Sequence, residues 1–248
     1  MSKERAALRK AAASASPRWR ELVATEMLGS KWGRLGEEHR ALMLAADGEE
    51  VELEQQGFRK GDVLVVVDMQ NDFRLLLSIA INLFKSLGKV HDSGWLHRDI
   101  KPGNIMLRDG SGRVYLVDFG MAKKYRSKSG GEHIPFVSKK KTVVGTAKYL
   151  STWGHRHMQQ SRRDDCASAM YTLAQVANGR LPWAKGGKQK PNMERVFRIK
   201  RETTAEDLFG GLPPSFVKVH RLVASLGFYD RPAYKRYIEI FLRDIRKL

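Results

Sequence analysis

The sequence predicts an α+β protein in which a reduced, β-containing N-terminal region precedes a larger part that is mainly α-helical. Two observations support this fold class. β-Branched and apolar runs typical of strands end before residue 118, whereas apolar residues at helical spacing continue to the C-terminus. With 248 residues, of which 42% are hydrophobic, the chain can bury a sizeable core.

Composition and charge limit the classes of function. The densest apolar run, Leu75 to Phe84, is about half the roughly 20 residues that a membrane-spanning helix needs, so no membrane segment is expected. A single cysteine, Cys166, excludes a disulfide framework and is typical of the cytoplasm or the nucleus. The formal net charge of +18 favours acidic or phosphorylated protein partners; nucleic acid is a further case, for which no binding motif is present. A monomer is expected.

The N-terminal end is the least informative part of the chain. Residues 1–20 are rich in Ala, Ser and Arg and are interpreted as a basic flexible tail, although organelle transit peptides have a similar composition. Within residues 21–73, a short helix is expected around Glu37 to Ala46. Gly61 to Met69 is a continuous β-branched run that predicts a buried strand.

Residues 74–248 have the clearer periodicity and are interpreted as a second, mainly helical region. Apolar residues recur every three or four positions from Leu76 to Val90 and predict a helix that stops near His91. Two short strands, Ile105 to Leu107 and Val114 to Val117, are separated by turn residues. Three further helices are expected at 163–178, 214–226 and 232–246, and in the last of them Tyr234, Ile238, Phe241 and Ile245 fall on one face.

Chemistry concentrates in HRDIKPGN, which lies between the first helix and the first of these strands. Phosphoryl transfer needs a carboxylate near the attacking hydroxyl, a cation near the transferred group, and oxygen ligands for magnesium. In this loop Asp99 can accept or orient the substrate hydroxyl proton, and Lys101 can neutralise charge on the phosphoryl group. Asn104, five residues after Asp99, can bind magnesium.

VDFG, at the end of the second strand, supplies a second magnesium ligand, Asp118. Phe119 and Gly120 would set the packing and the turn that aim its carboxylate. An isolated HRD or DFG is weak evidence, but the two together, with Asn104 at the required offset and a strand, turn and strand between them, form a specific pattern. The expected nucleotide and metal are ATP and Mg²⁺.

From about Leu76 to Leu248 the chain resembles the C-terminal lobe of a eukaryotic serine/threonine protein kinase, and more narrowly that of the casein kinase I family and its vaccinia-related relatives. Ser151-Thr152-Trp153 stands where that family has Ser-Ile-Asn and other kinases have Ala-Pro-Glu. The resemblance implies a kinase-like fold with residues 21–73 as a degenerate or truncated N-lobe. The narrower similarity rests on YLVDFGMAKKY at Tyr115, HIPF at His133, GTAKYLS at Gly145, QSRRDD at Gln160 and LPW at Leu181, in the family's order.

The resemblance also implies roles for further residues. His97 is expected to be structural and to pack under Phe119, and Arg98 to order the activation segment. Thr146 is expected to hydrogen-bond beside the catalytic aspartate and lysine, which favours serine or threonine as the target. Asp165 would accept hydrogen bonds from the backbone of the catalytic loop.

Members of this family prefer acidic or already phosphorylated sequences, so the resemblance also implies an anion site on the substrate face. A solvated basic surface is the alternative interpretation for any single lysine. The candidate side chains are Lys139, Lys140, Lys141, Lys148 and Lys188.

Two parts of a complete kinase are not recognisable upstream, namely the Gly-rich loop over the phosphates and the strand lysine that pairs with a helix glutamate. The glycine cluster at Leu28 to Gly36 has the wrong spacing, and neither Lys31 nor Lys60 has the expected context. Two functional classes therefore stay open. One is an active serine/threonine kinase, and the other is a catalytically impaired pseudokinase or truncated kinase that binds proteins through its basic substrate face.

The segment GDVLVVVDMQNDF has two interpretations. As the last N-lobe strand and the hinge, it would present backbone groups near Asp68, Met69 and Gln70 to adenine. It also resembles the first strand of isochorismatase-like hydrolases, in which the residue matching Asp68 is a catalytic base. Those enzymes need a nucleophilic cysteine in their own sheet, whereas Cys166 lies in a kinase-like helix. A hydrolase is therefore disfavoured, although a composite chain or a rearranged gene is consistent with the likeness.

Overall fold

The computed structural model of the chain describes residues 73–108, 113–126, 131–139, 142–184 and 192–248, and the backbone of 43–44 and 50–51. The expected tail, the strand at 61–69, the hinge at 68–70 and Lys140, Lys141 and Lys188 lie outside these residues. The helices are α3 (Phe73–Asp92), α4 (Thr152–His155), α5 (Arg162–Asn178), α6 (Met193–Glu202), α7 (Ala205–Phe209), α8 (Pro214–Ala224) and α9 (Tyr234–Ile245). The strands are β1 (Met43–Leu44), β2 (Glu50–Val51), β3 (Trp95–Leu96), β4 (Ile105–Arg108), β5 (Arg113–Leu116) and β6 (Lys123–Lys124).

The helix predicted from Leu76 to Val90 is confirmed as α3, which is buried along its apolar face. Leu76, Leu83, Leu87 and Val90 are fully buried in the core. α3 ends in a turn at Gly94, which has a φ of +86° and therefore a conformation that glycine adopts without steric cost. This turn leads into β3 and from there into the HRD loop.

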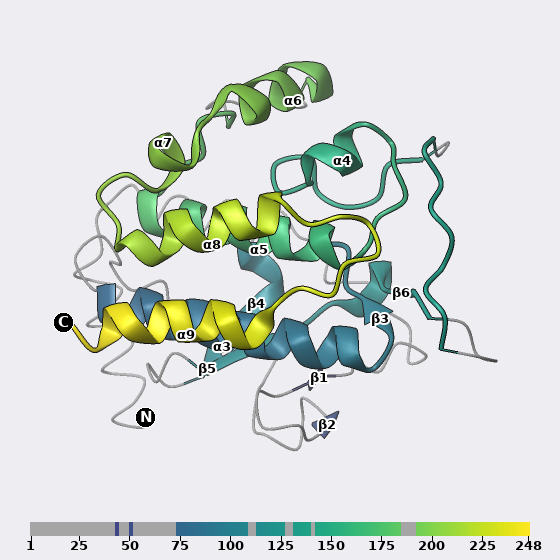
Figure 1. The fold of residues 1–248 in the computed structure, drawn as a ribbon. Helices are drawn as coiled ribbons and strands as arrows, with labels where there is room; N and C mark the ends of the chain where they lie inside the picture. The colour runs from purple at the N-terminus through teal and green to yellow at the C-terminus, as the bar shows by residue number, and fades with distance from the viewer. Residues whose placement is uncertain are drawn as a thin grey trace, which may run out of the picture.

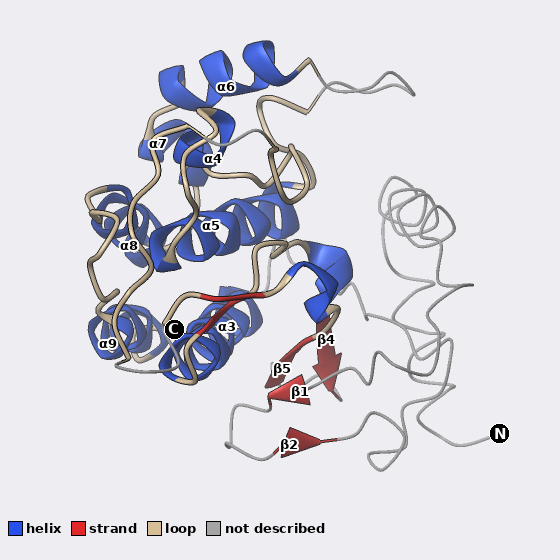
Figure 2. Cartoon of the chain, turned by 90° about the vertical axis from the view of Figure 1, so that its right-hand side faces the viewer, coloured by secondary structure: helices blue, strands red, loops and turns tan. Residues whose placement is uncertain are grey.

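β4 and β5 form the predicted hairpin, with Ile105 opposite Leu116. β1 and β2 extend it into a four-stranded antiparallel sheet with the order β2-β1-β5-β4 (Figure 2). The helix expected around Glu37 to Ala46 is wrong at Met43–Leu44, because Leu44 pairs with Leu116 at the free edge of β5. Tertiary pairing here overrides the local preference of the chain.

α5 and α9 lie against α3, and α8 packs against both of them. α5 begins after Ser161 and stops at Gly179, and α9 packs beside α3, where the Phe84 and Phe241 rings stack at 6.1 Å (Figure 1). The predicted face of α9 is rotated in the structure, since Tyr237 and Ile240 are buried and Ile238 and Ile245 only partly so. The predicted fold class, α+β with a mainly helical C-lobe, is confirmed.

None of the described helices combines the length and the apolar character needed to cross a membrane. α3, α5, α8 and α9 lie side by side (Figures 1 and 2), and their buried apolar side chains belong to a single cluster. The catalytic loop joins this cluster through the buried Ile100, whose carbonyl oxygen lies 3.5 Å from the Thr172 hydroxyl of α5.

Candidate active site

The backbone of the HRD loop is hydrogen-bonded to a buried carboxylate of α5, that of Asp165. The backbone N–H groups of His97 and Arg98 donate to Asp165 at 2.7 Å and 2.8 Å. Arg98 has a φ of +68°, an uncommon conformation for a residue with a side chain, and these two hydrogen bonds hold it in place. Asp165 also contacts the His91 ring at 2.9 Å, and the other ring nitrogen of His91 meets the hydroxyl of Tyr234 in α9.

The ionisation of Asp165 fits this role. Burial alone would raise its pKa, but the hydrogen bonds from His91 and from the His97 backbone outweigh burial, and the pKa lies below its ordinary value. Asp165 is therefore a carboxylate at neutral pH, with its charge directed at the backbone of the loop. The catalytic loop is tied through His91 to α3 and through Tyr234 to the C-terminal helix.

Asp99 lies at the centre of the site. One of its carboxylate oxygens, Oδ2, accepts from Lys101 Nζ at 2.7 Å and from Asn104 Nδ2 at 3.2 Å. The other, Oδ1, accepts from the Thr146 hydroxyl at 2.7 Å and from its backbone N–H at 3.0 Å. Burial raises the pKa of Asp99, but Lys101 and Thr146 more than offset this effect, so the pKa is lowered and the carboxylate is ionised.

His97 is a structural residue in this arrangement. Its ring is fully buried and lies 4.8 Å from the Phe119 ring, and its Nε2 is 3.0 Å from the carbonyl oxygen of Val117. Burial lowers the pKa of His97, so the neutral ring donates one hydrogen bond to Val117. It therefore links the HRD loop to the strand that carries the DFG sequence.

The two candidate magnesium ligands are brought together by the same strand. The N–H of Val117 donates to the carbonyl oxygen of Asn104 at 3.1 Å, so Asp118 follows directly after a residue bonded to Asn104. Asp118 is exposed, has a φ of +63° and accepts from Gly120 N at 3.3 Å. Arg98 completes the link, since its Nε donates to Met121 O at 2.6 Å.

The donor chemistry of these two side chains fits magnesium. Asn104 uses its amide nitrogen to donate to the Asp99 backbone oxygen at 2.8 Å, which leaves the amide oxygen as the atom that can meet a cation. A carboxylate and an amide oxygen, completed by phosphates and water, form a donor set that Mg²⁺ accepts. No three His, Cys, Asp or Glu side chains converge within the described residues, so magnesium would depend on this pair and on the nucleotide.

The loop that carries Thr146 must approach the HRD loop very closely. Gly145 has a φ of +105°, and a Cβ placed on it would lie 2.6 Å from the carbonyl oxygen of Arg98. Only glycine fits this contact. The requirement explains why Gly145 precedes Thr146 at this point in the sequence.

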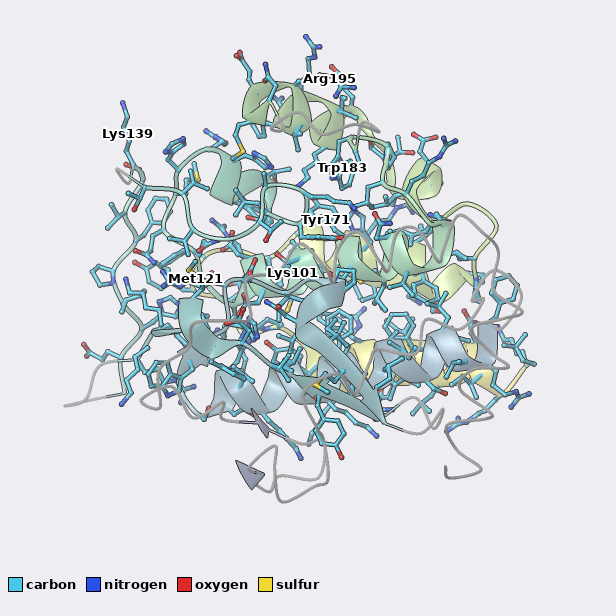
Figure 3. All side chains as sticks on the ribbon, turned by 180° about the vertical axis from the view of Figure 1, so that it is seen from behind. Lys101, Met121, Lys139, Tyr171, Trp183 and Arg195 are labelled. Carbon is cyan, nitrogen blue, oxygen red and sulfur yellow. The ribbon has the colours of Figure 1, made fainter. Side chains whose placement is uncertain are left out.

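The lysines predicted to bind anions are not gathered into one site by the described residues. Lys139 is exposed and projects away from Lys101 in Figure 3. Lys148 lies beside Thr146, with its Nζ 5.3 Å from the centre of the Tyr149 ring. The other three candidates are outside the described residues.

Three residues that contact the site were not predicted from the sequence. His91 and Tyr234 orient Asp165 from distant parts of the chain, and Lys200 donates to the loop that follows Thr146. A single lysine in an amphipathic helix is weak sequence evidence for a buried role, and the sequence gives no indication of which groups it contacts. Cys166 is fully buried, and burial raises the pKa of its thiol, so it lacks the exposure and ionisation that a nucleophile requires.

The family comparisons agree with this geometry. The profile of the protein kinase domain matches residues 66–215, and that of the phosphotransferase enzyme family matches residues 6–125. Casein kinase I homolog RAG8 of Kluyveromyces lactis is 34% identical over 181 residues, which cover 71% of this chain and 34% of that protein. The chain therefore spans about a third of the length of the curated relative it matches. It is similar to a casein kinase I homolog and belongs to the protein kinase family.

Proposed function

We propose that this chain is a serine/threonine protein kinase that transfers the γ-phosphate of ATP to protein hydroxyl groups. The observation that carries the proposal is the arrangement around Asp99, whose two carboxylate oxygens are held by Lys101, Asn104 and Thr146. An in-line transfer from ATP to an alcohol requires a carboxylate for the acceptor hydroxyl and a cation near the transferred group, and here the Thr146 hydroxyl orients the carboxylate.

Each side chain has a defined part in this reaction. Asp99 is ionised and accepts or orients the proton of the attacking hydroxyl. Lys101, within hydrogen-bond distance of both Asp99 and Thr146, places a positive charge beside the group being transferred. Asn104 and Asp118 would hold Mg²⁺, which neutralises phosphate charge when bound.

The preferred acceptors are proposed to be acidic or already phosphorylated sequences. The formal net charge of +18 supports this preference, because a basic surface attracts anionic partners. Lys148, two residues after Thr146, which contacts Asp99, is the described lysine proposed to meet such an acceptor. Lys139 would act only on a longer substrate, since it projects from the edge of the molecule (Figure 3).

A protein-binding module without turnover is the second candidate. It is favoured by the absence of a recognisable Gly-rich loop and strand lysine from the sequence, since these groups normally hold the α- and β-phosphates. The same basic surface would then bind an acidic partner, and the Asp99 cluster would serve only to order the loop.

Transfer of labelled γ-phosphate from magnesium-ATP to casein tests the proposal. The full chain is compared with Asp99→Asn and Asp118→Asn, which remove charge and preserve shape. Glu206→Gln is the matched control, because Glu206 is an exposed carboxylate paired with Arg221 away from the site. We expect transfer by the wild type and the control and its loss in both site variants.

The magnesium-dependent rise in melting temperature on adding ATP separates the two candidate functions. A kinase gives both the shift and the transfer, and Asp118→Asn weakens the shift because one magnesium ligand is lost. If the folded wild type binds casein but transfers no phosphate, the kinase proposal for this chain fails and the binding module replaces it.

A further inference from the structure

The loop after Gly145 is held on two sides. Toward the HRD loop, Thr146 donates twice to Asp99 Oδ1, from its hydroxyl and from its backbone. The loop then closes on itself, because Thr146 O accepts from the N–H groups of Tyr149 and Leu150 at 2.9 Å and 3.0 Å. Three further carbonyl groups of the loop, those of Ala147, Lys148 and Leu150, accept hydrogen bonds from later parts of the chain.

Two side chains from those later parts of the chain satisfy these carbonyl groups. Lys200 of α6 donates to Ala147 O at 3.1 Å and to Leu150 O at 2.5 Å. Trp183 Nε1 donates to Lys148 O at 2.8 Å. Three carbonyl groups in the four residues after Thr146 are thus capped by side chains at least 35 residues away.

The environment of Lys200 is built around its amine. Lys200 is only 5% exposed, and Nζ lies 4.8 Å from the centre of the Tyr171 ring and 5.0 Å from that of Trp183. In Figure 3 these two aromatic side chains lie between α6, marked by Arg195, and Lys101. Within the described residues Lys200 has no carboxylate partner; its remaining polar neighbour is His155 Nε2 at 3.3 Å.

A buried lysine without a counter-ion is unusual, because an unpaired buried charge is costly. Burial lowers the pKa of Lys200 to about 6, so the amine can be neutral. A neutral amine still has two N–H bonds, one for each carbonyl group. The two hydrogen bonds to the loop therefore persist in either protonation state.

We propose that Lys200 is a positioning residue for the phosphoryl-acceptor site. By fixing the carbonyl groups of Ala147 and Leu150, it holds the loop so that Thr146 stays against Asp99. It acts through Thr146 and touches no reacting atom. The catalytic part of this inference rests on the proposed kinase function, whereas the anchoring of the loop does not.

Hydrogen exchange tests the anchoring without requiring activity. Lys200→Met keeps the length and apolar volume of the side chain and removes the donors, and Lys218→Met, on the exposed face of α8, is the matched control. We expect exchange of the amides of Thr146, Tyr149 and Leu150 to become about tenfold faster in Lys200→Met only, with the amides of α5 unchanged. Unchanged loop exchange, or an equal acceleration throughout the protein, overturns the proposal.

Kinetics test the consequence for catalysis. With casein as acceptor, Lys200→Met should lower kcat about tenfold and leave the KM for ATP unchanged, because the acceptor side alone is disturbed. An unaltered kcat contradicts the positioning role. If the wild type itself transfers no phosphate, the proposed function fails, and the exchange result alone decides whether Lys200 anchors the loop.

A second variant covers the case in which Lys200→Met does not fold. Trp183→Phe keeps an aromatic ring against Tyr171, whose ring centre is 5.0 Å from that of Trp183. It removes the donor to Lys148 O together with part of the buried indole. It should accelerate exchange of the same three amides by a smaller factor. If it has no effect on them, the side chains behind the loop do not position it.

Discussion

Asp99 shows how one residue is prepared by its neighbours. Its carboxylate is mostly buried, which raises the pKa, yet the hydrogen bonds from Lys101 and Thr146 and the charge of Lys101 outweigh burial and lower the pKa. Hydrogen bonds to a charged group contribute about 1.5–3 kcal/mol each. The strength of the base and its position are therefore set by the same contacts.

Thr146→Val removes the hydroxyl donor and keeps the backbone donor. We expect kcat to fall about tenfold or more, because a hydrogen bond to the charged Asp99 is lost. The pKa of Asp99 should rise, since Thr146 lowers it, and the acid limb of the rate profile should move to higher pH. A pH series of kcat measures both effects.

The control for this change is Thr203→Val, in which the lost hydroxyl bonds only to Ile199 O in α6. It should leave both kcat and the acid limb in place. If Thr146→Val has the same profile as Thr203→Val, the Thr146 hydroxyl does not act on Asp99.

Gly145→Ala should destabilise the protein by about 2 kcal/mol or more, because it combines a positive φ with a clash against Arg98 O. Gly211→Ala is the control: its φ is +81°, but nothing lies within 4 Å of the added Cβ. Urea unfolding of both variants separates conformational strain from steric contact. Equal losses of stability would show that the close approach of the two loops has no energetic cost.

At the scale of single residues, the structure brings together the predicted site residues that are close in sequence. Asp99, Lys101 and Asn104 lie within six positions of one another, so the motif alone suggests a shared site. Thr146 could be proposed only through the family resemblance. Lys200 and Tyr234 could not be proposed, because their roles depend on tertiary contacts across 50 or more residues.

At the scale of elements, the ionisation of Lys200 in α6 can be measured through its effect on the free energy of unfolding. The pKa of Lys200 is 10.5 in the unfolded chain, and burial lowers it to about 6 in the folded protein. Between pH 6 and pH 10.5 the unfolded state therefore binds one more proton. The free energy of unfolding should therefore increase with pH in this window, by at most about 1.4 kcal/mol per pH unit. Lys200→Met should remove this contribution.

Measurement between neutral pH and about 9 avoids the other titratable groups around Lys200. His155 of α4 has a pKa lowered to about 4, by burial and by Lys200, and burial raises that of Tyr171 in α5. Both titrate outside the chosen range. If wild type and Lys200→Met have parallel stability curves from urea unfolding, Lys200 is charged in the folded protein.

Whether a helix or strand could be predicted from the sequence depended on its length. The patterns that became α3, α5, α8 and α9 each extend over three turns or more, so their periodicity is clear. α4 and α7 and the two-residue strands β3 and β6 are too short for a pattern to emerge. α6 begins after the capping residue Asn192, a start signal that the sequence analysis did not use. The strand at Met43 was mistaken for helix because its partner, β5, lies 72 residues later.

At the scale of the molecule, the fold class could be predicted because the motifs follow one another in a kinase order over residues 76–248. The sequence before residue 73 offered no such order, since its glycines and lysines are not at the spacing of a phosphate clamp. Both family profiles nevertheless include residues 66–125. Assays of nucleotide binding therefore belong on the full chain.

The net charge of +18 makes one prediction for the whole protein. Screening reaches about 8 Å at physiological ionic strength, so attraction between a basic surface and an anionic substrate weakens as salt is added. The KM for phosphorylated casein should rise several-fold between low and physiological salt, whereas that for dephosphorylated casein should rise less. Equal salt dependence for the two substrates would contradict a preference for phosphorylated acceptors, because the added phosphate charge would then contribute nothing to binding.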